Sequence, residues 1–302
     1  MKNIIIIAFV LYTIFPGFSA YAVNEEELHK IRDAISSEFL VQPKQGRIML
    51  VFSLSNGFKH KCIPYWAQAL TLMGQQTGAF KVVHSQDMDI FSVDKLREFD
   101  AICFNNTTRL TPDLSQQKAI MDFIKSGKGI VGIHAATDNF SEWKEGQEMM
   151  GGRFTGHPWK HDGTWAINID APDHPLTKMF KGKGFTIRDE IYRTDPPLYS
   201  RSQQCVLMSL DMSDAATKNE VKKPEDRDTG ITWFKSVGKG RLFYCSLGHN
   251  IELTWNTPML EHYLAGIQYG LGDLKVDDTI AAQTGASVHL DEPNSLIKKN
   301  SN

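Results

Sequence analysis

Apolar runs alternate with amphipathic segments along residues 47 to 134, and this alternation predicts the core of the fold. Runs at 47–53, 80–84, 100–105 and 130–133 have the length and composition of strands that are buried on both faces. Between them, residues 64–76 and 111–125 have helical patterns, with Thr111 expected as the N-cap of the second helix. This order predicts an α/β fold with a doubly wound, mainly parallel sheet and helices on both faces.

Shorter apolar runs follow in the second half of the chain. Residues 164–170, 184–187, 205–210 and 229–234 predict short strands that extend the sheet in antiparallel fashion. A last strand at 241–246 and a closing helix at 258–271 complete the pattern. Residues 211–228 are polar and lysine-rich without periodicity, so we expect a surface loop there.

The two ends of the chain differ from the middle. Residues 1–22 combine Lys2, an apolar run and the ending Ala20-Tyr21-Ala22, which is typical of a cleaved secretory signal peptide; an uncleaved anchor is the alternative. We divide the rest into an N-terminal helical extension (23–46), whose residues 24–39 have helical periodicity, one α/β domain (47–272) and a polar C-terminal tail (273–302). We expect a periplasmic or secreted protein that has no membrane anchor after cleavage.

Composition narrows the class of partner. Of 302 residues, 33 are Lys or Arg and 35 are Asp or Glu, so a formal net charge of -2 argues against nucleic acid or an anionic membrane as a partner. A small-molecule ligand is expected, and a homo-oligomer is left open. The four cysteines form no Cys-x-x-Cys pair and three lie in apolar runs, which favours buried thiols over disulfides or structural zinc.

Histidines follow several predicted strands, where a doubly wound sheet places its ligand sites. His134 stands between small residues in Gly132-Ile133-His134-Ala135-Ala136, a pattern similar to a nucleophile elbow, while His60 follows the first strand and His249 the last. An imidazole in such a place suits proton transfer, metal binding or the holding of a hydroxyl group. The alternative for each histidine alone is a structural role.

Polar and aromatic residues nearby in the pattern complete the set of candidates. Carboxylates and imidazoles suit acid–base catalysis, side-chain amides bind hydroxyl groups, and indole rings stack on sugar rings. For Trp159 the alternative is packing in the core, and for the two asparagines it is capping of a turn. The candidate catalytic residues are His134, Glu190 and His249, and the candidate substrate-binding residues are His60, Asn105, Asn106, His157, Trp159 and Tyr192. A divalent metal ion is the one cofactor left open, with His60, His134, His157 and His249 as candidate ligands, although no His-Glu-x-x-His motif supports it.

Six motifs in this order resemble the ThuA-like, or trehalose-utilisation, family. They are Gly57-Phe58-Lys59-His60, Phe104-Asn105-Asn106-Thr107, Gly127 to Ala136, Gly151 to Pro158, Asp189-Glu190-Ile191-Tyr192, and Gly240 to His249. The resemblance implies the fold of class I glutamine amidotransferases, which is flavodoxin-like. His134 stands where those enzymes keep a nucleophilic cysteine, so glutamine hydrolysis is not expected; His249 and Glu252 fall near their His and Glu partners.

The resemblance also implies a function with disaccharides or glycosides, in pathways that first oxidise a sugar hydroxyl to a ketone. We therefore expect an exported carbohydrate-processing enzyme, a hydrolase or lyase that acts on glycosides or 3-keto-glycosides by His and carboxylate acid–base chemistry. Two alternatives remain, a non-catalytic sugar-binding module and a keto-sugar isomerase. Turnover of the sugar separates the enzymes from the binding module.

Overall fold

A nine-stranded sheet forms the centre of the computed structural model, which describes residues 23–37, 39–194 and 196–277. Its order is β2-β1-β3-β4-β11-β10-β9-β6-β7, and the first five strands are parallel while the last four continue it in antiparallel fashion. The strands are β1 (Ile48–Phe52), β2 (Lys81–Ser85), β3 (Ala101–Asn105), β4 (Gly129–Ile133), β6 (Thr164–Ile169), β7 (Phe185–Arg188), β9 (Cys205–Leu210), β10 (Gly230–Val237) and β11 (Gly240–Cys245). The predicted parallel core and its antiparallel extension are confirmed.

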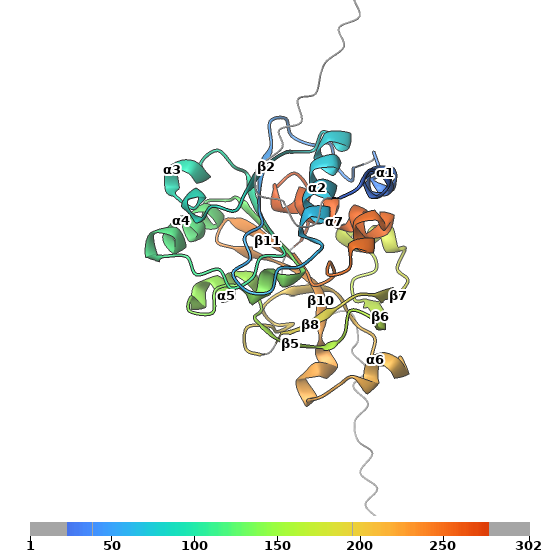
Figure 1. Cartoon of the computed structure of the whole chain (residues 1–302). Coiled ribbons are helices and arrows are strands. Elements are labelled where there is room, and N and C mark those ends of the chain that lie inside the picture. The colour runs from blue at the N-terminus through green and yellow to red at the C-terminus, as the bar shows by residue number, and fades with distance from the viewer. Residues whose placement is uncertain (1–22, 38, 195, 278–302) are drawn as a thin grey trace, which may run out of the picture.

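Helices cover both faces of this sheet, as predicted (Figure 1). Alternate residues of a strand point to opposite faces, so Met49 and Val51 of β1 join one hydrophobic core and Leu50 and Phe52 the other. In Figure 1, α1, α2 and α7 lie on one side and α3, α4 and α5 on the other. These helices are α1 (Glu25–Ala34), α2 (Ile63–Thr77), α3 (Val93–Leu96), α4 (Leu114–Lys125), α5 (Lys144–Met150) and α7 (Thr257–Gly270).

The start of α4 differs from the prediction. Asp113, not Thr111, is the N-cap, and its carboxylate accepts hydrogen bonds from the amides of Ser115 and Gln116. The Gln116 side chain accepts one in return from the Asp113 amide, which completes a capping box. Pro112 therefore precedes the cap, and the helix begins two residues later than the Thr111 pattern implies.

Two segments contain structure that the sequence pattern did not reveal. Strands β5 (Phe154–Trp159) and β8 (Ile191–Thr194) pair as a separate two-stranded sheet. The polar segment 211–228, expected as a loop, contains α6 (Ala215–Asn219) and a 3-10 turn (Pro224–Asp228). Asp214 explains the first of these, because its carboxylate caps α6 by accepting from the amide of Thr217.

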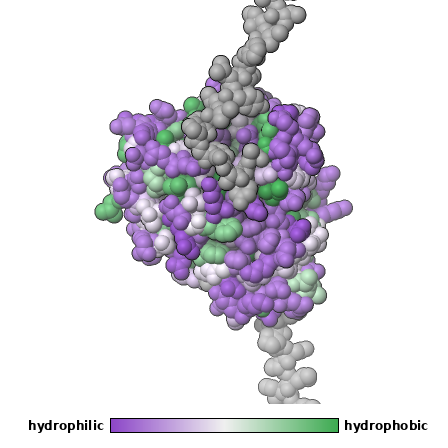
Figure 2. Space-filling view, viewed as in Figure 1, coloured by the Kyte–Doolittle hydropathy of each residue, from purple (hydrophilic) through white to green (hydrophobic). Residues whose placement is uncertain are grey.

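Burial agrees with the apolar pattern. The face of the molecule in Figure 2 is mainly hydrophilic, and hydrophobic side chains appear on it in small separate groups. All four cysteines lie in the described part of the chain as buried thiols without disulfides, as expected. Among the helices that the structure describes, none combines the length and apolar character that crossing a membrane requires. The segment predicted as a signal peptide (1–22) and most of the predicted tail (273–302) lie outside the described residues, so these segment boundaries stay predictions.

Candidate active site

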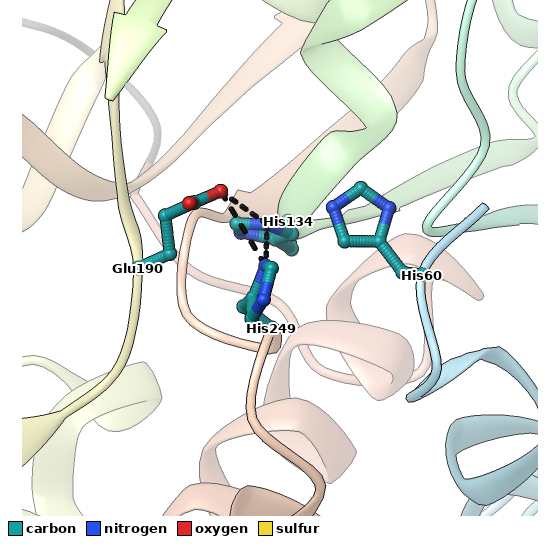
Figure 3. A group of neighbouring side chains, drawn as sticks. All are labelled: His60, His134, Glu190 and His249. Atoms are coloured by element: carbon teal, nitrogen blue, oxygen red, sulfur yellow. Dashed lines mark hydrogen bonds and ion pairs between the residues drawn. The ribbon is translucent and has the colours of Figure 1, made fainter. Parts of the chain in front are cut away.

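Three histidines and one glutamate converge at the carboxyl ends of the parallel strands. His60, His134, Glu190 and His249 each offer one nitrogen or oxygen atom, and these four atoms all lie within 4.8 Å of one another (Figure 3). We call these four residues the His–Glu cluster. His60 comes from the loop after β1, His134 directly follows β4, His249 follows β11, and Glu190 lies between β7 and β8. The cluster lies where doubly wound sheets place their ligands.

His134 is held in one orientation by its neighbours. Its backbone has a φ of 45°, in the left-handed region, and Tyr244 donates a hydrogen bond from its hydroxyl to the His134 carbonyl (2.7 Å). Its Nδ1 lies 2.7 Å from the carbonyl oxygen of Ser246, and because a carbonyl only accepts, Nδ1 carries the proton. Nε2 is therefore the atom that faces the cluster, 3.3 Å from Nδ1 of His249.

The loop that carries His249 is anchored by a buried carboxylate. Asp189 accepts hydrogen bonds from the amides of Gly248 (2.7 Å), His249 (3.3 Å) and Asn250 (2.7 Å). Burial raises the pKa of Asp189, while the nearby histidines and these amides oppose the rise. Asp189 thus fixes the backbone at His249 without joining the cluster.

Glu190 connects the inside of the cluster to its edge. Oε1 lies 3.4 Å from Nδ1 of His249 and 3.7 Å from Nε2 of His134, while Oε2 lies 3.1 Å from Nδ1 of His157. Burial alone raises the pKa of Glu190, but the hydrogen bonds and charges of His134 and His249 outweigh it and hold the pKa well below its usual range. The carboxylate is therefore anionic at neutral pH.

His60 closes the cluster on the side away from Glu190 (Figure 3). Its ring centroid lies 5.0 Å from those of His134 and His249, the residue is 2% exposed, and its Nδ1 has no hydrogen-bond partner among the described residues. Burial, and next the charges of His134 and His249, lower the pKa of His60 to about 2. His60 is thus uncharged at neutral pH.

His157 and Tyr192 border the cluster. The side chain of His157 is 38% exposed, and its Nδ1 lies 3.1 Å from Glu190 Oε2 and 3.1 Å from Nζ of Lys160. The first contact needs a proton on Nδ1 and the second a lone pair, so the two contacts favour opposite protonation states. The Tyr192 ring packs on His134 at a centroid distance of 4.2 Å, and burial raises its hydroxyl pKa.

Other predicted site residues have structural surroundings. Asn105 is buried and donates from Nδ2 to Ser53 and Ile63, while its Oδ1 accepts from Asn106. Trp159 is fully buried and its indole donates to the Thr217 carbonyl, so neither face of the ring is available to a sugar. This placement removes Trp159 from the candidate sugar-binding residues.

One contributor to the site, Phe58, was not among the residues that the sequence singled out. Glu252, which the family resemblance placed near the Glu partner of the amidotransferases, is exposed, whereas Glu190, a predicted catalytic residue, is the carboxylate of the cluster. Phe58 is 66% exposed, and its ring meets that of His60 edge-on at a centroid distance of 4.8 Å. It is the one aromatic residue among the exposed large hydrophobic residues of the described chain. Its place two residues before His60, in a strand-end loop, was the available signal.

Fold and site together define a doubly wound α/β protein of the flavodoxin-like and glutamine amidotransferase-like class, with a cluster of histidines and one carboxylate at the ends of its strands. The sequence matches the ThuA family, described as trehalose utilisation, over residues 48–270, and the chain belongs to this family. Its function is therefore related to carbohydrates.

Solved structures agree with this fold. A thua-like protein from Bacteroides uniformis is 22% identical with a TM-score of 0.61, over 76% of this chain and 93% of that one. A thua-like protein from Parabacteroides merdae is 18% identical with a TM-score of 0.56, over 77% and 93%. At these identities the likeness supports the fold alone. The search of curated proteins found no match.

Proposed function

We propose that this chain is a carbohydrate-processing enzyme, a hydrolase or lyase that acts on glycosides and in particular on 3-keto-glycosides. The observation that carries the proposal is the arrangement of Glu190, whose Oε1 faces buried His134 and partly buried His249 while Oε2 faces half-exposed His157. An anionic carboxylate shared in this way joins a buried polar centre to a group that a substrate can reach. Family membership supports the sugar as substrate class.

His157 is the group that we assign to proton transfer. It is the more exposed of the histidines that contact Glu190, with 38% of its side chain exposed against 18% for His249. Its Nδ1 has both Glu190 and Lys160 within 3.1 Å, so the ring finds a partner in either protonation state. A general base and acid needs such a balance between its two forms.

The reaction is an elimination. The ketone at C3 of the oxidised sugar makes the C2 proton acidic, and the His157 imidazole removes that proton. The electron pair of the C2–H bond forms the enolate and then the C1–C2 double bond as the C1–O bond breaks. The leaving oxygen takes a proton from the imidazolium or from water, so the step is redox-neutral and needs no oxidant.

Phe58 is the group that we assign to binding of the sugar ring. Its ring is 66% exposed beside His60, and aromatic faces pack against the C–H bonds of sugars. Phe58 therefore takes the role that the sequence pattern suggested for Trp159. The His–Glu cluster forms the polar centre against which the substrate oxygen lies.

Incubation of the purified chain with 3-keto-glucosides and their unoxidised parents tests this proposal, with products followed by NMR. We expect turnover of the keto sugars only, with a loss of about 10²–10⁴-fold in His157→Ala. His29→Ala, on exposed α1 beside Asp33, is the matched control that keeps full activity. Isomerised sugar without a released aglycone would favour the isomerase, and unchanged sugar that raises the melting temperature would favour a binding module.

Export of the protein is a further part of this proposal. The composition of residues 1–22 supports it. N-terminal sequencing of the protein from a periplasmic or culture fraction tests it, with Val23 expected as the first residue. Recovery of the chain with Met1 intact from the cytoplasm would contradict export.

A further inference from the structure

We propose that the His–Glu cluster binds one divalent transition-metal ion of the zinc type, with nitrogen ligands from His60, His134 and His249 and an oxygen ligand from Glu190. The inference deepens the proposed function, on which it rests for the use of the ion. Binding of the ion itself is a separate property and is measured without a substrate.

The spacing of three donor atoms fits metal ligands better than hydrogen bonds. Nε2 of His134, Nδ1 of His249 and Oε1 of Glu190 form a triangle with edges of 3.3, 3.4 and 3.7 Å. In an N–H···O hydrogen bond the nitrogen and oxygen atoms lie about 2.9–3.0 Å apart. Ligands at about 2.0–2.1 Å from a tetrahedral zinc ion lie about 3.4 Å apart. The triangle therefore matches one face of a zinc coordination tetrahedron.

His60 supplies the fourth donor. The residue is 2% exposed, and its ring centroid lies 5.0 Å from those of His134 and His249. Figure 3 shows one ring nitrogen of His60 facing these two rings, while Nδ1 lies on the far side. The nitrogen that faces the rings completes a set of four donor atoms, which all lie within 4.8 Å of one another.

Contacts outside the cluster hold the ligands as metal sites require. Ligating histidines generally donate the other ring N–H to a carbonyl or carboxylate, which fixes the free nitrogen toward the metal. His134 does so through Nδ1 and the Ser246 carbonyl. Glu190 is held through Oε2 by His157, and the His249 backbone is held by Asp189. Three of the four ligands are thus oriented before any ion arrives.

Charge and donor type select the ion. Magnesium and calcium prefer oxygen ligands, whereas imidazole suits zinc, copper, iron or nickel, so three histidines and one carboxylate favour the second group. The ion also has a use in the proposed reaction. The negative charge of Glu190 would repel the negative charge of a developing enolate, and a bound divalent ion would supply a Lewis acid that reverses this repulsion.

Metal binding to the chelator-stripped full chain is the test. After dialysis against zinc, elemental analysis is expected to find one ion per chain, with a raised melting temperature, while dialysis against magnesium leaves the stripped state. Cobalt is expected to give the visible absorption of a site with nitrogen and oxygen ligands. His134→Gln and Glu190→Gln are expected to lose the ion, and His157→Gln to weaken binding by about 10–100-fold. His29→Gln is the control that keeps it.

Circular dichroism of each variant shows whether a lost ion reflects a lost fold. Two separate ligand variants, His134→Gln and Glu190→Gln, keep the test valid if one of them does not fold. One zinc per chain in well-folded His134→Gln and Glu190→Gln would overturn the proposal. Zinc binding without turnover of any sugar would support the metal site and overturn the proposed function. Turnover by a chain that binds no zinc would do the reverse.

Discussion

The carboxylate of Asp189 accepts a hydrogen bond from the backbone amide of His249, with 3.3 Å between the amide nitrogen and Oδ2. The next residue, Glu190, faces the side chain of that same histidine, with Oε1 3.4 Å from Nδ1. Two consecutive carboxylates therefore hold one histidine by its backbone and by its ring. Only the second of them belongs to the His–Glu cluster, and the two make different predictions.

Asp189→Asn is expected to lower both stability and activity. The amide group that replaces one carboxylate oxygen cannot accept from the amides of Gly248 and Asn250 together, so the loop that carries His249 loosens. Hydrogen bonds to a charged group contribute about 1.5–3 kcal/mol, and we expect a loss of that size in urea unfolding. Glu190→Gln, a change of the neighbouring carboxylate, is the variant to compare with Asp189→Asn. An Asp189→Asn variant with the parent's urea midpoint would contradict the role of Asp189 as the anchor of the His249 loop.

Phe58→Ala is expected to raise KM and leave kcat unchanged. The exposed ring adds binding to the sugar, and aromatic contacts contribute about 0.5–1.5 kcal/mol, which corresponds to a KM increase of up to about tenfold. Stability should change by less than about 0.5 kcal/mol because the side chain is mostly exposed. Phe58→Tyr should keep the parent's KM. Equal KM values in all three proteins would exclude Phe58 from the sugar site.

Trp159→Phe is expected to show the opposite behaviour. The substitution removes the hydrogen bond from the indole to Thr217 and leaves a cavity in the core, so we expect a loss of about 1–3 kcal/mol in unfolding free energy. KM should not change, since the ring does not reach the surface. A raised KM at unchanged stability would restore the sugar-stacking interpretation.

Buried His262 and partly buried His174 predict how stability depends on pH. Burial lowers the pKa of His262 to about 4, and burial also lowers that of His174 to about 4. The unfolded value is about 6.5, so the unfolded chain binds these protons first, and stability falls as the pH drops from about 6.5 to about 4. Urea unfolding at several pH values measures this fall.

His262→Gln tests the origin of that pH dependence. Glutamine does not titrate and can still hydrogen-bond to the Leu176 carbonyl and the Thr232 hydroxyl, as His262 does. We expect a shallower fall in stability between pH 6.5 and 4 than in the parent or in His29→Gln. An unchanged slope would assign the pH dependence to other groups.

The parallel half of the fold was predictable because strands buried on both faces are continuous apolar runs, as in β1 and β4. Strand β5 was not, since Phe154–Trp159 contains Gly156 and Pro158, which are unfavourable in strands, and most of its residues are half-buried. The N-cap of α4 was misplaced because Thr111 and Asp113 are both good caps and only the backbone decides between them.

For the site, the rule of strand ends selected His60, His134 and His249, which the structure brings together. Their meeting with Glu190 depends on how the antiparallel strands fold back beside β11, and no local pattern encodes that. The same limit explains the aromatics. Phe58 and Trp159 look alike as sugar-stacking candidates in a sequence, but tertiary packing leaves one exposed and buries the other.

The left-handed backbone of His134 bears on the evolution of the protein. A residue with a side chain in this region costs about 1–3 kcal/mol, a strain that glycine or asparagine largely avoids. Selection for stability alone would favour such a replacement, so the histidine at this position carries a cost that only the use of its ring would offset. Gene copies released from selection for that use should drift toward glycine or asparagine at this position, which gives a simple mark for telling working copies from decaying ones.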